Sequence, residues 1–373
     1  MMNKVLGICN LHDSPSLGKL TKTRPLGALS FLSRFGLMDF TLSNFSNSEI
    51  DRVIILTESN ASAVTNHTGQ GNVWINNTRT GFLKILMNEK LIESPKFNTD
   101  IKNIEAHYSV IEDINPEYIV VAPTFFLMSI DFREVIEAHE ESGAEVTMVY
   151  LKTKKEKSGF MNCDSMIIEK NGVVSHVDTV VKEMKGQNIS LETFVFTRES
   201  FDKTIATAKK VSALYGIRKA LNYAINHHRL IVNAYQFDGY VVPIMSSKDF
   251  IDRSFDLLAY ENRSQLFNDN WPIYTTTHNT PPAFYGNKAN VMNSIVGNGA
   301  IIKGTVENSI ISRDVVVEEG AVVRNCILFT QTYVGKNKTL EYVLTDKNVK
   351  VVEVKELKGK KDDVLYVKQG ETV

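Results

Sequence analysis

The sequence predicts an α/β domain with a mostly parallel mixed sheet, followed by a parallel β-helix. Residues 1–243 alternate short β-branched apolar runs with amphipathic stretches, as expected for a sheet covered by helices on both faces. From residue 290 to residue 373, aliphatic residues instead recur about every six positions, with small or polar residues between them. Residues 244–289 show neither pattern. We therefore expect a helix and a linker there, between the two domains.

Apolar runs and helical spacing locate the elements of the first domain. The expected strands are 53–57, 118–122, 146–151, 230–235 and 239–243, with a β-hairpin over 166–176 that turns at Glu-Lys-Asn-Gly. The expected helices are 101–114, 131–141 and, in the middle segment, 249–266. Gly143 is expected to end the second of these helices.

The six-residue period predicts which side chains fill the β-helix. The recurring aliphatic positions are Ile295, Ile301, Val306, Ile311, Val316, Val322, Ile327, Val334 and Leu340. Each is expected to stack into a continuous core, although an ordinary β-meander is the alternative. Many β-helix proteins of this type are acyltransferases with a histidine base. No histidine follows His278, so that chemistry is not expected.

Composition restricts the classes of partner. The chain has 373 residues and a net charge of −1, which argues against attraction to nucleic acid or to an acidic membrane. Three widely spaced cysteines fit neither a disulfide framework nor a metal site. No apolar run approaches the ~20 residues of a membrane span, and no signal-peptide pattern is present. We expect a cytoplasmic protein.

The loop that follows the apolar run 5–9 lies where an open α/β sheet binds its ligand. A phosphate-binding loop needs glycines and a cation, but residues 10–16 contain neither. The loop is therefore either a different site or one that has lost its chemistry. His12, His67 and His107 lack metal-ligand spacing, so structural or surface roles are expected for them.

Four motifs resemble one known family. They are LTKTR at 20–24, DFTLSNFSNS at 39–48, HTGQG at 67–71 with Trp74, and TDKNV at 345–349. Together they resemble the ADP-glucose pyrophosphorylase (glucose-1-phosphate adenylyltransferase) family over nearly the whole chain. The resemblance implies a GT-A/Rossmann-like nucleotidyltransferase domain followed by a left-handed parallel β-helix.

The family's catalytic positions hold other residues in this chain. The glycine-rich loop places its two leading glycines on Leu11 and His12 and its arginine on Ser16, and the family's lysine falls on Leu26. A loop that lies against the nucleotide falls on 99–103. The two metal-binding aspartates fall on Phe125 and Pro243, which cannot ligate Mg²⁺. The resemblance therefore implies that this chain has no catalytic residue and binds no metal or other cofactor.

Some cationic positions of the family are kept. Lys182 falls on the lysine that contacts the phosphate of glucose 1-phosphate, and a solvated surface lysine is the alternative. Lys19, Lys22 and Arg24 lie near the region where the family binds regulatory sugar phosphates or organic acids. An ordinary charged surface is the alternative for these three residues.

The resemblance implies a regulatory subunit, inactive or nearly so, of the GlgD type. Such a subunit would pair with a catalytic, Mg²⁺-dependent GlgC-type subunit, as a heterotetramer, to make ADP-glucose from ATP and glucose 1-phosphate for glycogen synthesis. A homo-oligomer and a sugar-phosphate effector are further expectations, whereas nucleic acid and membrane partners are not expected. Two alternatives stay open: a divergent active nucleotidyltransferase with a remodelled site, and a stand-alone sugar-phosphate-binding interaction protein.

Overall fold

The computed structural model describes residues 2–88, 97–155 and 159–373. Its contacts divide the chain into two compact units. The first, here called the α/β unit, contains residues up to 29, 37–246 and 266–276. The second, the β-helix unit, contains 30–36, 247–265 and 277–373. Among the described residues, no helix combines the length and the apolar character needed to cross a bilayer.

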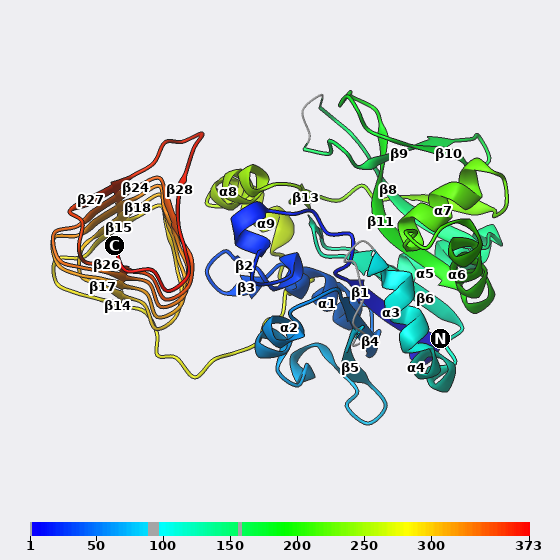
Figure 1. Ribbon diagram of the computed structural model, residues 1–373, viewed down its shortest axis with the longest axis horizontal. Coiled ribbons are helices and arrows are strands. Elements are labelled where there is room, and N and C mark those ends of the chain that lie inside the picture. The colour runs from blue at the N-terminus through cyan, green and yellow to red at the C-terminus, as the bar shows by residue number, and fades with distance from the viewer. Residues whose placement is uncertain (1, 89–96, 156–158) are drawn as a thin grey trace. The chain divides into compact units, whose positions relative to one another are not determined.

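A mixed sheet forms the centre of the α/β unit (Figure 1). Its main path runs β10-β9-β11-β6-β1-β4-β5, and β8 joins β11 to β12. The strands are β1 (Val5–Asn10), β4 (Arg52–Thr57), β5 (Phe82–Met87), β6 (Tyr118–Pro123), β8 (Val146–Lys152), β9 (Asp164–Ile168), β10 (Val174–Thr179), β11 (Asn188–Thr197) and β12 (Val232–Gln236). Strand β1 pairs in parallel with both β4 and β6, and β11 pairs antiparallel with β6. The fold expected from the sequence is confirmed, including the β9–β10 hairpin.

Helices flank this sheet. They are α1 (Met38–Asn47), α2 (Ala61–Thr68), α3 (Asp100–Ala106), α4 (Tyr108–Ile114), α5 (Phe132–Ser142), α6 (Arg198–Val211) and α7 (Ile217–Asn226). The expected helix α5 is confirmed. Its first turn is capped by Asp131, which accepts a hydrogen bond from the backbone N–H of Arg133 at 2.9 Å, and it ends at Gly143, whose φ is 61°.

The expected helix 101–114 is two helices, because His107 interrupts it. The ring Nδ1 of His107 contacts the carbonyl oxygen of Asn103 at 2.9 Å, while the backbone N–H of His107 turns to Ile104. A side chain thus takes the acceptor that a continuous helix would use. The expected helix 249–266 is likewise divided, into α8 (Ser247–Asp256) and α9 (Tyr260–Leu266). Here the guanidinium of Arg263 donates to the carbonyl oxygens of Leu257 and Leu258.

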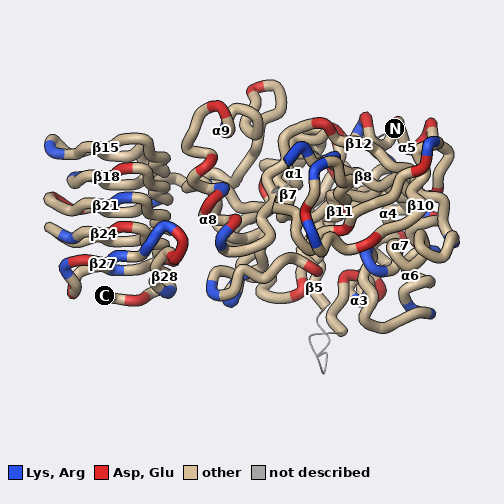
Figure 2. The backbone as a smooth tube through the Cα atoms, turned by 90° about the horizontal axis from the view of Figure 1, so that it is seen from above, with Lys and Arg blue, Asp and Glu red and all other residues tan. Residues whose placement is uncertain are grey.

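Three five-stranded parallel sheets form the β-helix, which begins at β14 (Phe284–Tyr285), before the expected residue 290. Figure 2 shows the strands of one face stacked in order, namely β15 (Asn290–Met292), β18 (Thr305–Glu307), β21 (Val322–Arg324), β24 (Thr339–Glu341) and β27 (Glu356–Lys358). The coils align residue by residue, as Val306 pairs with Val323 and Val323 with Leu340. The predicted β-helix is therefore confirmed, and the β-meander is excluded.

The predicted core positions of the β-helix are right only in part. Val306, Ile311, Ile327, Val334 and Leu340 are buried, as expected. Ile295, Ile301, Val316 and Val322 are only half-buried. At three of these positions the next residue is buried instead, namely Ile302, Val317 and Val323. Several coils have fewer residues than three complete six-residue units, since Ile301 pairs with Val316 and Val316 with Tyr333 one coil later. On some faces of the β-helix, a strict six-residue period therefore points to the residue just before the buried one.

Candidate functional site

The loop over the carboxyl end of β1 is held against the sheet by the protein's own side chains. The side-chain amide of Asn10 donates to Asp100 Oδ2 at 2.8 Å. The ring of His12 is buried, with Nδ1 3.2 Å from the carbonyl oxygen of Asn98 and Nε2 3.1 Å from Asn103 Nδ2. Because an amide N–H₂ can only donate, Nε2 accepts and Nδ1 carries the proton. Burial lowers the pKa of His12, which favours this neutral form.

Backbone N–H groups of the loop also have protein acceptors. Leu11 donates to the carbonyl oxygen of Leu56, and His12 donates to Asn10 Oδ1 at 3.0 Å. Leu17 and Gly18 donate to the side chains of Thr21 and Ser16. A loop that binds phosphate presents such N–H groups to its ligand. Here these four donors are already used within the protein.

Asp100 connects the end of β1 to the starts of α3 and α7. Its carboxylate accepts hydrogen bonds from the N–H groups of Ile101 at 2.7 Å and Ile217 at 3.1 Å, as well as from Asn10. The side chain is fully buried, and burial, with the nearby charge of Asp13, raises its pKa to about 6. The sequence marked residues 99–103 only as a changed nucleotide loop, so this linking role was not predicted.

A second buried cluster lies on β9, β11 and α7. Arg218 donates from Nε and Nη2 to the two carboxylate oxygens of Asp164, each at 2.7 Å, and its Nη1 lies 2.9 Å from Glu192 Oε1. The contact with Glu192 is an ion pair without an aligned hydrogen bond. Burial raises the pKa of Glu192 to about 8, although the charge of Arg218 opposes this, and Asp13 and Asp100 add to the rise. The start of α7 links the two clusters, because Ile217 donates to Asp100 and the next residue, Arg218, donates to Asp164.

Glu192 occupies an unusual backbone conformation. Its φ is 49°, and the register of β11 against β8 shifts between Ser190 and Thr193. A β-bulge therefore turns this glutamate out of the regular alternation of the strand. A non-glycine residue in the left-handed region is uncommon and concentrates at functional or strained sites. The sequence contains no signal for it.

The resemblance to the family places its two metal-binding aspartates on Phe125 and Pro243, which lie on two neighbouring segments. Strand β13 (Val242–Pro243) pairs antiparallel with β7 (Phe126–Leu127), with Pro243 opposite Phe126. The N–H of Ile244 donates to the carbonyl oxygen of Phe125 at 2.8 Å. Phe125 is 1% exposed, and its ring packs 4.7 Å from that of Phe126. These apolar side chains offer no ligand for Mg²⁺, so the residues present do not fit the metal.

No alternative metal site is visible in the described ranges 2–88, 97–155 and 159–373, where no group of three His, Cys, Asp or Glu residues could hold a metal ion. The three cysteines are buried and free. His67 pairs with the buried carboxylate of Asp39, which gives it a structural role.

The remaining candidate residues do not form one cluster. Ser16 is exposed in the loop, whereas Leu26 is buried. Lys19 and Lys22 are exposed, but Arg24 is only 4% exposed. The charged-surface alternative is therefore wrong for Arg24 and stays a prediction for Lys19 and Lys22. Lys182 is exposed in the segment after β10 and forms no ion pair within the described part of the chain.

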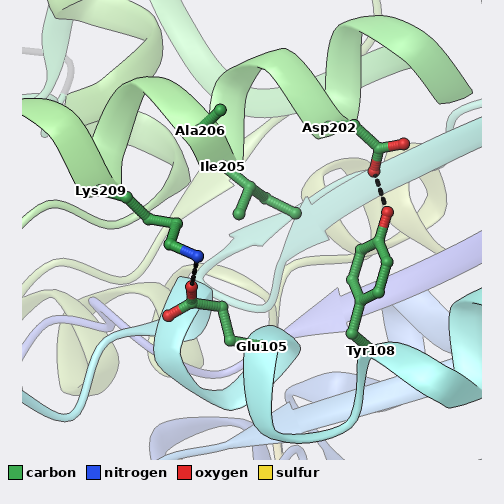
Figure 3. A pocket seen from close by; sticks show the side chains of 6 residues that line it. All are labelled: Glu105, Tyr108, Asp202, Ile205, Ala206 and Lys209. Atoms are coloured by element: carbon green, nitrogen blue, oxygen red, sulfur yellow. Dashed lines mark hydrogen bonds and ion pairs between the residues drawn. The ribbon is translucent and has the colours of Figure 1, made fainter.

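A separate pocket of about 380 Å³ opens between α3–α4 and α6 (Figure 3). Its polar side chains are paired across the helices. Lys209 contacts Glu105 at 2.8 Å, and the hydroxyl of Tyr108 donates to Asp202 at 2.6 Å. These pairs, with Ile205 between them, hold the helices together and leave the pocket without an unpaired charge among the residues drawn in Figure 3.

Comparison with known proteins agrees with this architecture. Residues 16–240 match the nucleotidyl transferase family, and residues 281–362 match the GlmU-like C-terminal hexapeptide family. The fold and these matches define a nucleotidyl transferase-type protein with a hexapeptide β-helix.

Two relatives identify the family within the nucleotidyl transferase-type proteins. Glucose-1-phosphate adenylyltransferase of Fervidobacterium nodosum is 30% identical over 89% of this chain and 80% of its own length. The protein of the same name from Bacillus cytotoxicus is 25% identical over 95% of each chain. This chain belongs to the glucose-1-phosphate adenylyltransferase family.

Proposed function

We propose that this protein is a non-catalytic, GlgD-type regulatory subunit of glucose-1-phosphate adenylyltransferase. Its partner would be a catalytic GlgC-type subunit that makes ADP-glucose from ATP and glucose 1-phosphate with Mg²⁺. The observation that supports this most directly is the pairing of β7 with β13. It places the segment of Phe125 beside that of Pro243, with Pro243 opposite Phe126, and the side chains of Phe125 and Pro243 are apolar and buried.

The chemistry of the reaction explains why that observation supports the proposal. Nucleotidyl transfer needs a cation held by carboxylates to neutralise the phosphates. It also needs donors aimed at the developing charge. In this chain the donors of the loop are bonded to the protein, and Ser16 and Leu26 occupy the positions of the family's arginine and lysine. These features of the described residues support the proposal that this chain does not carry out the reaction.

A subunit without chemistry acts through its contacts. It would bind the active state of the partner more tightly than the inactive state and so shift the partner toward activity. We include in the proposal a heterotetramer and a sugar-phosphate effector, for which the exposed Lys182, Lys19 and Lys22 are the candidate contacts. The buried Arg24 is less suited to meet a ligand from solvent.

The test is an assay of ADP-glucose formation by this chain alone, by a catalytic homologue alone, and by the two mixed. We expect no Mg²⁺-dependent product from this chain alone, co-elution of the two chains, and a changed rate or effector response in the mixture. Robust Mg²⁺-dependent activity of this chain alone would instead support a remodelled active enzyme. Neither co-elution nor any effect on the homologue would support a stand-alone binding protein.

A further inference from the structure

A groove lies within the β-helix unit, between α8 and one corner of the β-helix. Its volume is about 610 Å³, which is in the range of small-molecule sites. Helix α8 contributes Ile251, Phe255 and Arg253 to one wall. The opposite wall is a column of corner residues from successive coils, which we call the corner column: Asn293, Asn308, Asn325 and Tyr342.

The corner column presents side chains at the spacing of the coils. All four residues have left-handed backbone conformations, with φ between 41° and 52°. The backbone N–H of Asn325 donates to the carbonyl oxygen of Glu307 on the preceding coil. In the same way, the N–H of Tyr342 donates to the carbonyl oxygen of Arg324. Side chains in such a column repeat every ~4.8 Å. The amide of Asn293 donates to Asn308 at 2.7 Å, whereas the amide of Asn325 has no hydrogen-bond partner among the described residues.

Tyr342 ends the column in a conformation that does not suit it. Asn tolerates a left-handed backbone, but an aromatic residue at a φ of 52° is an outlier that costs free energy. The half-buried ring and Phe255 give the groove flat apolar surfaces. A strained aromatic residue in a groove indicates that the ring has a use there.

An unpaired donor also borders the groove. The Nε of Arg253 is buried and has no hydrogen-bond partner in the part of the chain that the structure describes, although Nη1 donates to Asp256 at 3.1 Å. A buried donor without an acceptor is unfavourable, and a ligand oxygen would relieve it. Described lining residues include three cations and four carboxylates, so the groove does not strongly favour a charged ligand of either sign.

We propose that this groove binds a short neutral oligosaccharide. Sugar hydroxyls both donate and accept hydrogen bonds, as the carboxamide of Asn325 does. The C–H face of a sugar ring can pack on Tyr342, and a hydroxyl oxygen can accept from Arg253 Nε. The proposal does not depend on the function proposed above, because it concerns a different unit of the chain.

Isothermal titration of the full chain with maltohexaose and with cellopentaose tests the proposal. Binding of either supports it, and the comparison identifies the linkage that the groove accepts. The first variant is Asn325→Gly, which removes the amide and keeps the left-handed backbone. We expect its affinity to fall about fivefold or more. The matched control is Asn348→Gly, at an exposed position with a φ of 62° that does not line the groove. It should bind normally.

Tyr342→Asn distinguishes a role of Tyr342 in ligand binding from a purely structural role. This variant relieves the backbone outlier, so its urea midpoint should equal or exceed that of the parent protein while its oligosaccharide affinity falls. A residue with only a structural role would leave the affinity unchanged. The proposal is overturned if the full chain binds neither oligosaccharide at millimolar concentration. It is equally overturned if Asn325→Gly and Tyr342→Asn both bind as tightly as the parent protein.

Discussion

The side-chain amide of Asn10 donates a 2.8 Å hydrogen bond to the carboxylate of Asp100, ninety residues further along the chain. Through this bond the loop after β1 is joined to the start of α3. The same carboxylate accepts from Ile217 at the start of α7, so three segments meet at one side chain. The conformation of the loop therefore depends on Asp100.

Replacing Asp100 should loosen all three segments. Asp100→Ala leaves three donors without their acceptor, and we expect a loss of about 3 kcal/mol in the free energy of unfolding. Asp100→Asn keeps one acceptor oxygen, so its loss should be smaller, about 1 kcal/mol. Urea denaturation near neutral pH measures both. Equal losses for the two variants would show that the carboxylate oxygens are not acting as shared acceptors.

Gly216 provides a steric test of the same contact. Its φ is −89°, so alanine is conformationally acceptable there. A β-carbon would nevertheless lie 2.6 Å from Asp100 Oδ1 and 2.8 Å from Asp13 Oδ2. Asp100 is held by several hydrogen bonds, so Gly216→Ala should destabilise the fold by roughly 1–3 kcal/mol. In an Asp100→Ala background the clash with Asp100 is removed, and the exposed side chain of Asp13 can move away, so most of that loss should disappear. Additive losses in urea denaturation would contradict the argument.

Glu192 should make stability depend on pH. Its folded-state pKa of about 8 lies above the ordinary value of 4.5, so the folded protein binds the proton more tightly than the unfolded chain does. This contribution is fully present below about pH 4.5 and is lost as pH rises through about 8. Glu192→Gln should reduce the decrease in the free energy of unfolding as pH rises. At alkaline pH this free energy should be roughly 1–3 kcal/mol higher for the variant than for the parent protein. Urea midpoints of both proteins, measured across this pH range, test the prediction. The same pH dependence for the two proteins would contradict it.

Magnesium and nucleotide should leave this chain unaffected. A ligand that binds the folded state raises the melting temperature, and the increase grows with the ratio of ligand concentration to Kd. Because Phe125 and Pro243 cannot ligate a cation, we expect Mg²⁺–ATP to shift the midpoint by less than about 1 °C in differential scanning fluorimetry. A catalytic homologue with both aspartates is the positive control. A saturable, Mg²⁺-dependent increase for this chain would refute the prediction.

The sequence predicted the architecture better than it predicted the site. Apolar runs predicted β4, β6 and β8, because buried strands have a strong local pattern. The six-residue period revealed the β-helix but misplaced Ile301 and Val316, since the number of residues per coil varies. The sequence predicted that the loop after β1 lies at the edge of the sheet where such folds bind ligands. In the structure, hydrogen bonds hold this loop over the carboxyl end of β1.

The buried charges of the site could not be predicted. Glu192, Arg218 and Asp164 lie on different elements and meet only after the sheet and α7 have formed. The bulge that turns Glu192 inward depends on a register shift against β8, which has no sequence signature. His107 also shows how a single side chain can divide a helix whose periodicity is otherwise regular.

The ladder between β7 and β13 also makes a carboxylate costly at positions 125 and 243. A mutation that introduced aspartate at position 125 alone would bury a lone charge beside Phe126, at a cost of several kcal/mol. An aspartate at position 243 alone would meet the same apolar surroundings. For the non-catalytic subunit proposed above, each single substitution toward a metal site would thus pass through a less stable protein.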